Sequence, residues 1–122
     1  MDSGSKFISV GKEQLHYSEW GSGNHLLLAF HGYGDSAEIF TPLKQYLQDK
    51  YTFLSIDMPH HGKSTWGDGM MSKEDLFALV EKLRVEYKVD KVSLVGYSMG
   101  GRICLTIMER MPHIMDKAVL LA

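Results

Sequence analysis

The sequence predicts an α/β protein whose mostly parallel sheet is covered by helices on both faces. Segments with strand character alternate with segments with helix character along the chain, which is typical of right-handed crossovers between parallel strands. Residues 26–30 are apolar at every position, as expected of a central strand buried on both faces. A strand, a tight turn and a helix also follow one another around Ser98. Together these three observations favour this fold class, and the length and composition of the chain fit a single domain, or part of one, over residues 1–122.

The amino-terminal part predicts a hairpin, a central strand and a helix. Residues 6–10 and 14–20 alternate apolar and polar side chains around a Gly-Lys-Glu turn, which favours an antiparallel pair. Strand 26–30 follows a turn that contains two glycines. We expect the first helix over about residues 37–48, interrupted near its start by Pro42, because proline lacks the backbone N–H that a helix interior requires.

A strand, a long loop and a second helix come next. The predicted strand 52–56 ends at Asp57, and the loop covers residues 58–71. Ser72 is placed to cap the helix, because a serine hydroxyl accepts a hydrogen bond from the first helical turn. Five apolar side chains then recur at helical spacing: Leu76, Phe77, Leu79, Val80 and Leu83. The last predicted strand covers residues 117–122.

Ser98 is the candidate nucleophile. The motif Gly-Tyr-Ser-Met-Gly at residues 96–100 follows a buried strand and opens an amphipathic helix, residues 99–111, which is the strand-turn-helix setting that lifts a serine hydroxyl clear of its surroundings. A serine remains a weak nucleophile until a nearby base takes its proton. The alternative interpretation is a glycine-rich loop with an incidental serine, and the context favours the nucleophile.

The base and the acid of a catalytic triad are not expected among these residues. Beyond Ser98, only His113 and Asp116 offer a histidine and a carboxylate. Both precede the last predicted strand and so lie at its amino end. Catalytic groups of parallel sheets gather at the carboxyl ends of the strands, where Ser98 lies. We therefore expect residues 1–122 to form the amino-terminal portion of a larger domain.

Composition and charge argue against several classes of protein. The formal net charge is −2, with 13 Lys and Arg against 15 Asp and Glu. The chain therefore lacks the excess of basic residues that would indicate nucleic-acid binding. Cys104 is the single cysteine, and its place in a helix indicates packing rather than a disulfide. Residues 1–9 lack the apolar core of a signal peptide, and residues 26–30 are too few to cross a bilayer. We expect a cytoplasmic protein that enters no membrane and needs no metal or other cofactor.

Over essentially its whole length the chain resembles the α/β-hydrolase superfamily. Three motifs carry the resemblance in the order of that family: His-Gly-Tyr-Gly at residues 31–34, Asp-Met-Pro-His-His-Gly-Lys-Ser at residues 57–64 and Gly-Tyr-Ser-Met-Gly-Gly at residues 96–101. The resemblance implies the first six strands of that fold, in the spatial order 1-2-4-3-5-6. The last two strands, the lid, the acid and the histidine of the family have no counterpart in these residues.

The resemblance also implies roles for single residues. Ser98 would be the nucleophile, and the N–H groups of Tyr33 and Met99 would form the oxyanion hole. Donors fixed in advance stabilise the charge that develops on a carbonyl oxygen, and the Met99 N–H also lies at a helix N-terminus, where anions are favoured. The Tyr33 ring would line the acyl pocket. Five further residues would shape the motifs: His31, Gly32, Asp57, Gly96 and Gly100. In the family the histidine at the position of His31 braces its loop and is not the base.

The second motif departs from the family pattern D-x-P-G-x-G-x-S, because His60 stands where the first glycine is expected. Glycine reaches backbone angles that other residues avoid, so the conformation of this loop is an open question. The pair His60-His61 would need further ligands to hold a metal, and Asp57 is the only one at hand. We favour a structural or solvated pair.

Two classes of function remain. The first is a serine hydrolase that acts on a small-molecule ester, thioester or related acyl substrate through an acyl-enzyme on Ser98; carbon–carbon bond hydrolysis or a lyase-like elimination is a related alternative, since one fold hosts several chemistries. The second is a non-catalytic or split protein of the same fold that acts in binding or assembly. The isolated chain is expected to be inactive. We also expect it to self-associate through its last strand or to need a complementary carboxyl-terminal segment.

Overall fold

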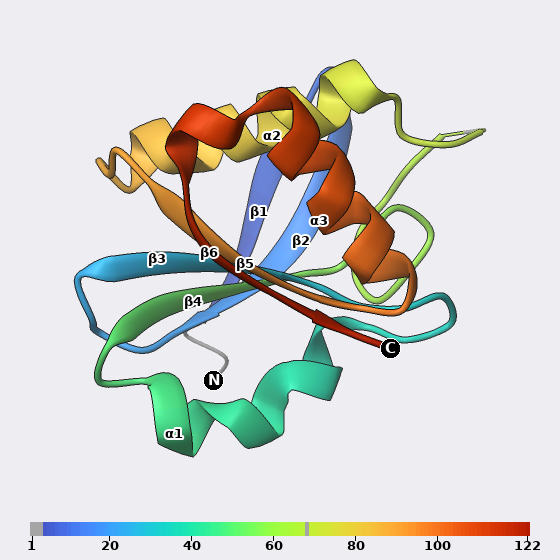
Figure 1. The fold of residues 1–122 in the computed structure, drawn as a ribbon. Helices are drawn as coiled ribbons and strands as arrows, with labels where there is room; N and C mark the ends of the chain where they lie inside the picture. Colours follow the sequence, from blue (N-terminus) through green and yellow to red (C-terminus); the bar gives the residue numbers. More distant parts are fainter. Residues whose placement is uncertain (1–3, 68) are drawn as a thin grey trace.

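Six strands form one mixed sheet in the computed structural model, which describes residues 4–67 and 69–122. Residues 1–3 and 68, part of the amino-terminal segment and of the long loop considered above, lie outside the described residues. The strands are β1 (Ser5–Val10), β2 (Glu13–Trp20), β3 (His25–Phe30), β4 (Tyr51–Ile56), β5 (Val92–Tyr97) and β6 (Met115–Leu121). Their order in the sheet is β1-β2-β4-β3-β5-β6, so the predicted order is confirmed (Figure 1).

The sheet is antiparallel at one side and parallel over the rest. β1 pairs with β2, and β2 pairs with β4, in antiparallel registers. β4, β3, β5 and β6 run parallel, so their carboxyl ends lie along one edge of the sheet. This arrangement brings the loops after β3, β4 and β5 together, and these loops carry the three motifs of the sequence.

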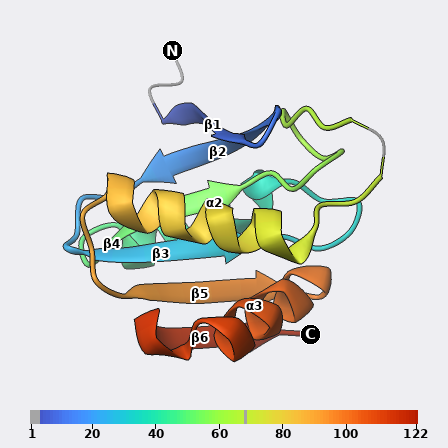
Figure 2. The ribbon, with the colours of Figure 1, turned by 90° about the horizontal axis from the view of Figure 1, so that it is seen from above.

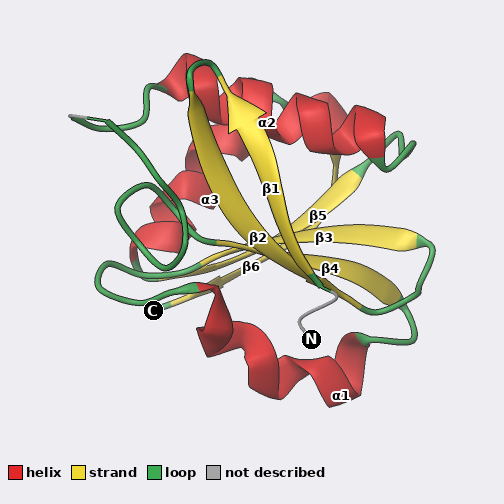
Figure 3. Cartoon of the chain, turned by 180° about the vertical axis from the view of Figure 1, so that it is seen from behind, coloured by secondary structure: helices red, strands yellow, loops and turns green. Residues whose placement is uncertain are grey.

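Helices cover both faces of the sheet, as predicted. α2 (Lys73–Glu86) and α3 (Met99–Arg110) lie on one face, whereas a 3₁₀ helix (Ala37–Leu43) that runs into α1 (Lys44–Leu47) lies on the other (Figures 1 and 3). Seen from above, α2 lies over the middle strands β3 and β4, and α3 lies over β5 and β6 (Figure 2). Of the helices in the described part of the chain, none has both the length and the apolar character needed to cross a membrane.

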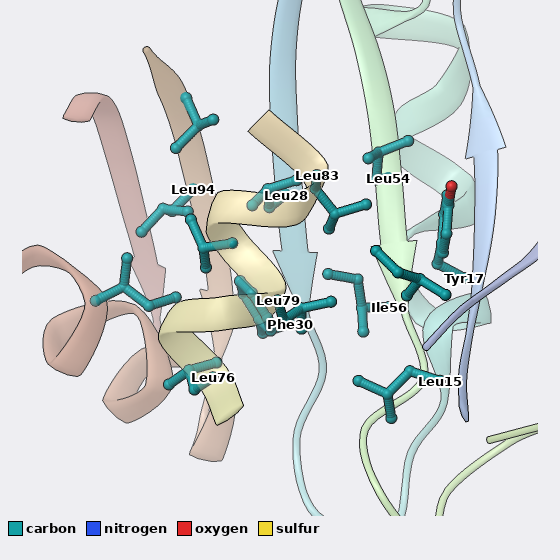
Figure 4. Close-up of a cluster of buried hydrophobic side chains, with 14 of the residues drawn as sticks. Leu15, Tyr17, Leu28, Phe30, Leu54, Ile56, Leu76, Leu79, Leu83 and Leu94 are labelled. Carbon is teal, nitrogen blue, oxygen red and sulfur yellow. The ribbon is translucent and has the colours of Figure 1, made fainter. Parts of the chain in front are cut away.

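The larger core lies between the sheet and α2. Leucines of α2 pack against residues that alternate along β3 and β4 (Figure 4): Leu76, Leu79 and Leu83 face Leu28, Phe30, Leu54 and Ile56. The intervening strand residues, Leu27, Ala29 and Phe53, point to the other face and pack with Phe40 of the 3₁₀ helix. β3 is thus buried on both faces, which explains why its sequence is apolar throughout.

Two elements differ from their predicted form. The helix expected over residues 37–48 is a 3₁₀ helix to Leu43 and then four α-helical residues. Pro42 explains this, because it removes an N–H from the helical ladder and its ring would clash with the carbonyl four residues earlier. β6 begins at Met115 rather than at residue 117. The predicted cap of α2 is confirmed, with the Asp75 N–H donating to Ser72 Oγ over 3.0 Å.

Candidate active site

Ser98 lies at the tip of the turn between β5 and α3. Its backbone has φ 55° and ψ −113°, a combination that costs a non-glycine residue on the order of 1–3 kcal/mol. Two hydrogen bonds hold the turn: the Ser98 N–H donates to Leu121 O over 2.8 Å, and the Gly101 N–H donates to Ser98 O over 2.9 Å. The residue is exposed, so the sharp turn presents its hydroxyl to solvent.

Glycines allow the close approach of the chain on either side of Ser98. A Cβ at Gly96 would lie 2.3 Å from the Gly100 carbonyl oxygen, and a Cβ at Gly100 would lie 1.9 Å from the Phe30 carbonyl oxygen. A Cβ at Gly32 would lie 3.3 Å from Ser98 Cβ. The main chain of the loop after β3 therefore runs directly against the serine.

The loop after β3 forms a β-turn that carries Tyr33. The Asp35 N–H donates to Gly32 O over 3.1 Å, and Gly34 has φ 83°, as a type II turn requires at its third position. Within the described residues, the Tyr33 N–H donates to no protein acceptor. The Met99 N–H, at the first position of α3, has no acceptor inside the helix. Both N–H groups are thus available to a ligand.

His31 joins this loop to the loop after β4. Its ring is fully buried; Nδ1–H donates to Gly32 O over 2.7 Å, and Nε2 accepts from the Met58 N–H over 3.0 Å. Burial lowers the pKa of His31, because the charged imidazolium loses its hydration. The ring is therefore neutral, and neither nitrogen is free to take a proton from Ser98.

Asp57 organises the loop after β4. Its buried carboxylate accepts from the Ala37 N–H over 2.7 Å, from the Lys63 N–H over 3.0 Å and from His16 Nδ1–H over 2.7 Å. A Cβ at Gly62, which has φ 52°, would collide with this carboxylate. His16 was not predicted as part of the site. Nothing in the sequence marks it, because it is one position of an alternating strand and meets Asp57 only through the β2–β4 pairing.

The two histidines of this loop bond in different directions. His60 has φ 68°, in the left-handed region that favours glycine, at the position where the family pattern has a glycine. His60 Nε2–H donates to Gly69 O over 2.9 Å. His61 Nδ1–H donates to Pro59 O, and His61 Nε2 accepts from the Gly34 N–H, each over 2.9 Å. Among the described residues, no group of three or more potential metal ligands could hold an ion.

A cleft of about 540 Å³ opens beside the elbow. Tyr33 and Met99 line it together with apolar side chains of the loop after β4, α2 and α3, namely Met58, Pro59, Met70, Met71, Leu76 and Ile103. The charged side chains among its lining residues are Lys73 and Arg102. The cleft can therefore take an apolar group that ends close to the two free N–H groups.

His113 and Asp116 lie at the far end of the sheet, as predicted. His113 is in the 3₁₀ turn Pro112–Ile114, and Asp116 is the second residue of β6. Ser98 bonds to Leu121 at the other end of β6. Asp116 and Leu121 are five positions apart along β6, which corresponds to about 16 Å. These two side chains do not form a triad with Ser98.

A mostly parallel sheet with an exposed serine on a strained strand-to-helix turn defines the class of α/β-hydrolases. A family model described as alpha/beta hydrolase fold matches residues 25–122. The uncharacterized hydrolase YugF of Bacillus subtilis (strain 168) is 33% identical over 116 residues, which are 93% of this chain and 42% of YugF. A pimeloyl-[acyl-carrier protein] methyl ester esterase of Legionella pneumophila (strain Lens) is 34% identical over 87 residues, 71% of this chain and 33% of the esterase.

A solved structure agrees with these relatives. The crystal structure of E-2-(acetamidomethylene)succinate hydrolase is 28% identical with a TM-score of 0.80, and the match covers 93% of this chain and 42% of that one. The chain belongs to the α/β-hydrolase fold family, and the resemblance inferred from its motifs is confirmed. It spans less than half the length of the relatives named here.

Proposed function

We propose that the protein is a serine hydrolase that cleaves an ester, a thioester or a related acyl substrate through an acyl-enzyme on Ser98. The observation that carries this proposal is the geometry of the elbow: an exposed serine at φ 55°, with the main chain of the loop after β3 packed against it. Backbone strain of this kind clusters at active sites, and in a nucleophile elbow the strained turn exposes the serine hydroxyl. The names of the relatives, among them a methyl ester esterase, agree with acyl chemistry.

In the proposed reaction, Ser98 Oγ attacks the acyl carbon while a base takes its proton. The carbonyl oxygen becomes an oxyanion that accepts hydrogen bonds from the Tyr33 and Met99 N–H groups, each such donor being worth about 2.7–4 kcal/mol of barrier. Collapse expels the alcohol or thiol, which receives the proton from the base. Water then attacks the acyl-enzyme while the base takes a proton from the water. Ser98 Oγ leaves and receives that proton, and the acid product is released. The apolar cleft beside Met99 would take the acyl chain of a small-molecule substrate.

Trapping of the acyl-enzyme in the full-length gene product tests this proposal. After p-nitrophenyl acetate is added, we expect mass spectrometry to find one acetyl group on Ser98, and we expect Ser98→Ala to lose both the adduct and turnover. Cys104→Ala is the matched control. Burial raises the pKa of the Cys104 thiol to about 12, so this thiol stays protonated and is a poor nucleophile. Its removal should therefore leave acylation unchanged. Acylation of the Ser98→Ala variant at the wild-type rate would refute the proposal.

A second observation favours the view that residues 1–122 do not act alone. His31 and His61 have both ring nitrogens in hydrogen bonds, and His113 lies at the opposite end of β6. We therefore propose that the base and the acid come from outside these residues. The 122-residue chain should hydrolyse p-nitrophenyl acetate at no more than the residual rate that oxyanion donors and binding supply. Robust turnover that is lost on Ser98→Ala would contradict this and would point to a histidine of the loops after β3 and β4: His31, His60 or His61.

A further inference from the structure

Two histidines connect the loops after β3 and β4, each by accepting a backbone N–H from the other loop. His31, from the first loop, accepts the Met58 N–H of the second. His61, from the second loop, accepts the Gly34 N–H of the first. Their ring centroids are 4.9 Å apart. The His31 bond is buried and lies at the base of its loop, whereas the His61 bond lies at the tip, beside Tyr33.

The peptide that His61 holds is the one that decides the type of the turn. Gly34 N–H belongs to the Tyr33–Gly34 peptide, which is the central peptide of the turn closed by Asp35 N–H and Gly32 O. Rotation of that central peptide converts a type II turn into a type I turn and brings the third residue to a negative φ. Gly34 at φ 83° permits either form. An acceptor fixed opposite its N–H selects one of them. The Tyr33 N–H belongs to the preceding peptide, which has the same orientation in both forms, so the bond to His61 acts on that N–H by holding the whole turn in place.

His61 is itself held firmly enough to act as that acceptor. Its backbone N–H donates to Met58 O over 3.0 Å, and its carbonyl oxygen accepts from the Ser64 N–H over 3.1 Å. Its Nδ1–H donates to Pro59 O, which leaves Nε2 unprotonated and directed at Gly34. The Tyr33 ring meets the His61 ring edge to face, with centroids 5.6 Å apart. Ring, turn and neighbouring loop therefore form one packed unit.

We infer that His61 is a positioning residue for the oxyanion hole, acting through Gly34 N–H to anchor the loop that carries the Tyr33 N–H against the loop after β4. This inference rests on the proposed function of Tyr33, since a donor accelerates acyl transfer only if it is aimed in advance at the developing charge. His61 does not touch the reacting atoms. Its loss should lower kcat while leaving KM within about threefold, because the aimed N–H matters chiefly in the transition state.

Two amide substitutions distinguish the contribution of His61 Nε2 from that of His61 Nδ1. His61→Gln places an oxygen near the position of Nε2 and can still accept the Gly34 N–H. His61→Asn reaches only the position of Nδ1 and can bond Pro59 O but not Gly34. In the full-length protein we expect kcat to fall on the order of 10- to 100-fold in His61→Asn, below the 10²- to 10³-fold typical of removing a donor outright, and to stay within about threefold of wild type in His61→Gln. His25→Ala, at the amino end of β3, is the matched histidine control.

A second readout does not depend on activity. By nitrogen-detected NMR, wild-type His61 should carry its proton on Nδ1, and the Gly34 amide should exchange its hydrogen at least about tenfold faster in His61→Asn than in wild type or His61→Gln. A proton on Nε2, or equal kcat in the Asn variant and wild type, would overturn the inference, as would Gln and Asn variants that fall equally. If the wild-type protein shows no hydrolysis while the NMR results hold, the proposed function has failed and the contact between the loops has not.

Discussion

Gly100 and Gly101 are neighbours in the first turn of α3, yet their surroundings are opposite. A Cβ at Gly100 would lie 1.9 Å from the Phe30 carbonyl oxygen, whereas a Cβ at Gly101 would meet nothing closer than Leu120 Cβ at 4.0 Å. We expect Gly100→Ala to lower the free energy of unfolding by at least about 2 kcal/mol, because backbone must move. Gly101→Ala should raise it by up to about 1 kcal/mol through helix propensity. Urea unfolding of the pair measures both changes, and equal destabilisation would contradict the packing described here.

His31 should make stability depend on pH. Its burial lowers the pKa of the folded state below the unfolded value of about 6.5. Between these two pKa values the unfolded chain binds a proton that the folded chain does not, so the free energy of unfolding rises with pH in that window and falls on acidification. Above about pH 7 the contribution is fully present. Chemical unfolding from pH 5 to 8 should show a shallower slope in His31→Asn, which cannot take up this proton; an unchanged slope would rule out the effect.

At the scale of elements, the N-terminus of α2 depends on one hydroxyl. Ser72 is extended, and its Oγ accepts the Asp75 N–H over 3.0 Å. We expect Ser72→Ala to lower the free energy of unfolding by about 1 kcal/mol, because that N–H loses its acceptor. Ser72→Asp should retain most of the stability, since a carboxylate accepts the same bond and interacts favourably with the helix dipole. Thermal and urea unfolding provide the measurement, and a neutral Ser72→Ala would show that solvent replaces the cap.

The elements that the sequence predicts best are those whose signal is local. Three signals act within a few positions of sequence: the continuous apolar run of residues 26–30, the Ser72 cap and the glycines at 96 and 100. Each is found again in the fold. The strand order required the family resemblance, because periodicity contains no information on which strands are neighbours.

The contacts between loops could not be predicted in the same way. His16 meets Asp57 across 41 positions of sequence, and His61 meets Gly34 across 27. Each pair forms only because β4 lies between β2 and β3. The positive φ of His60 likewise could not be predicted from the sequence, because histidine seldom adopts that conformation. Residues that brace a site through long-range hydrogen bonds therefore need the fold before they can be found.

At the scale of the whole molecule, the parallel side of the sheet ends in an apolar strand. β6 pairs with β5 on one side, and no other strand of the described residues pairs with its second side. Val119, Leu120 and Leu121 are 54%, 43% and 44% exposed. Leu120 lies toward α3, near Gly101, so Val119 and Leu121 point to the opposite face. There the 3₁₀ helix and α1 cover β3 and β4 (Figure 1), whereas Val119 and Leu121 remain exposed.

An apolar strand with unpaired backbone groups recruits another strand, and we propose that the purified 122-residue chain self-associates through β6 unless a complementary segment covers it. Sedimentation at micromolar concentration should give a mass above that of the monomer. Val119→Lys should lower the association, because a charge on an edge strand opposes pairing. Lys12→Glu, in the distant β1–β2 turn, is a control that leaves β6 unchanged. A monomer with a cooperative thermal transition would show that the strand is stable without a partner, and a Val119→Lys variant that associates as strongly as wild type would move the interface away from β6.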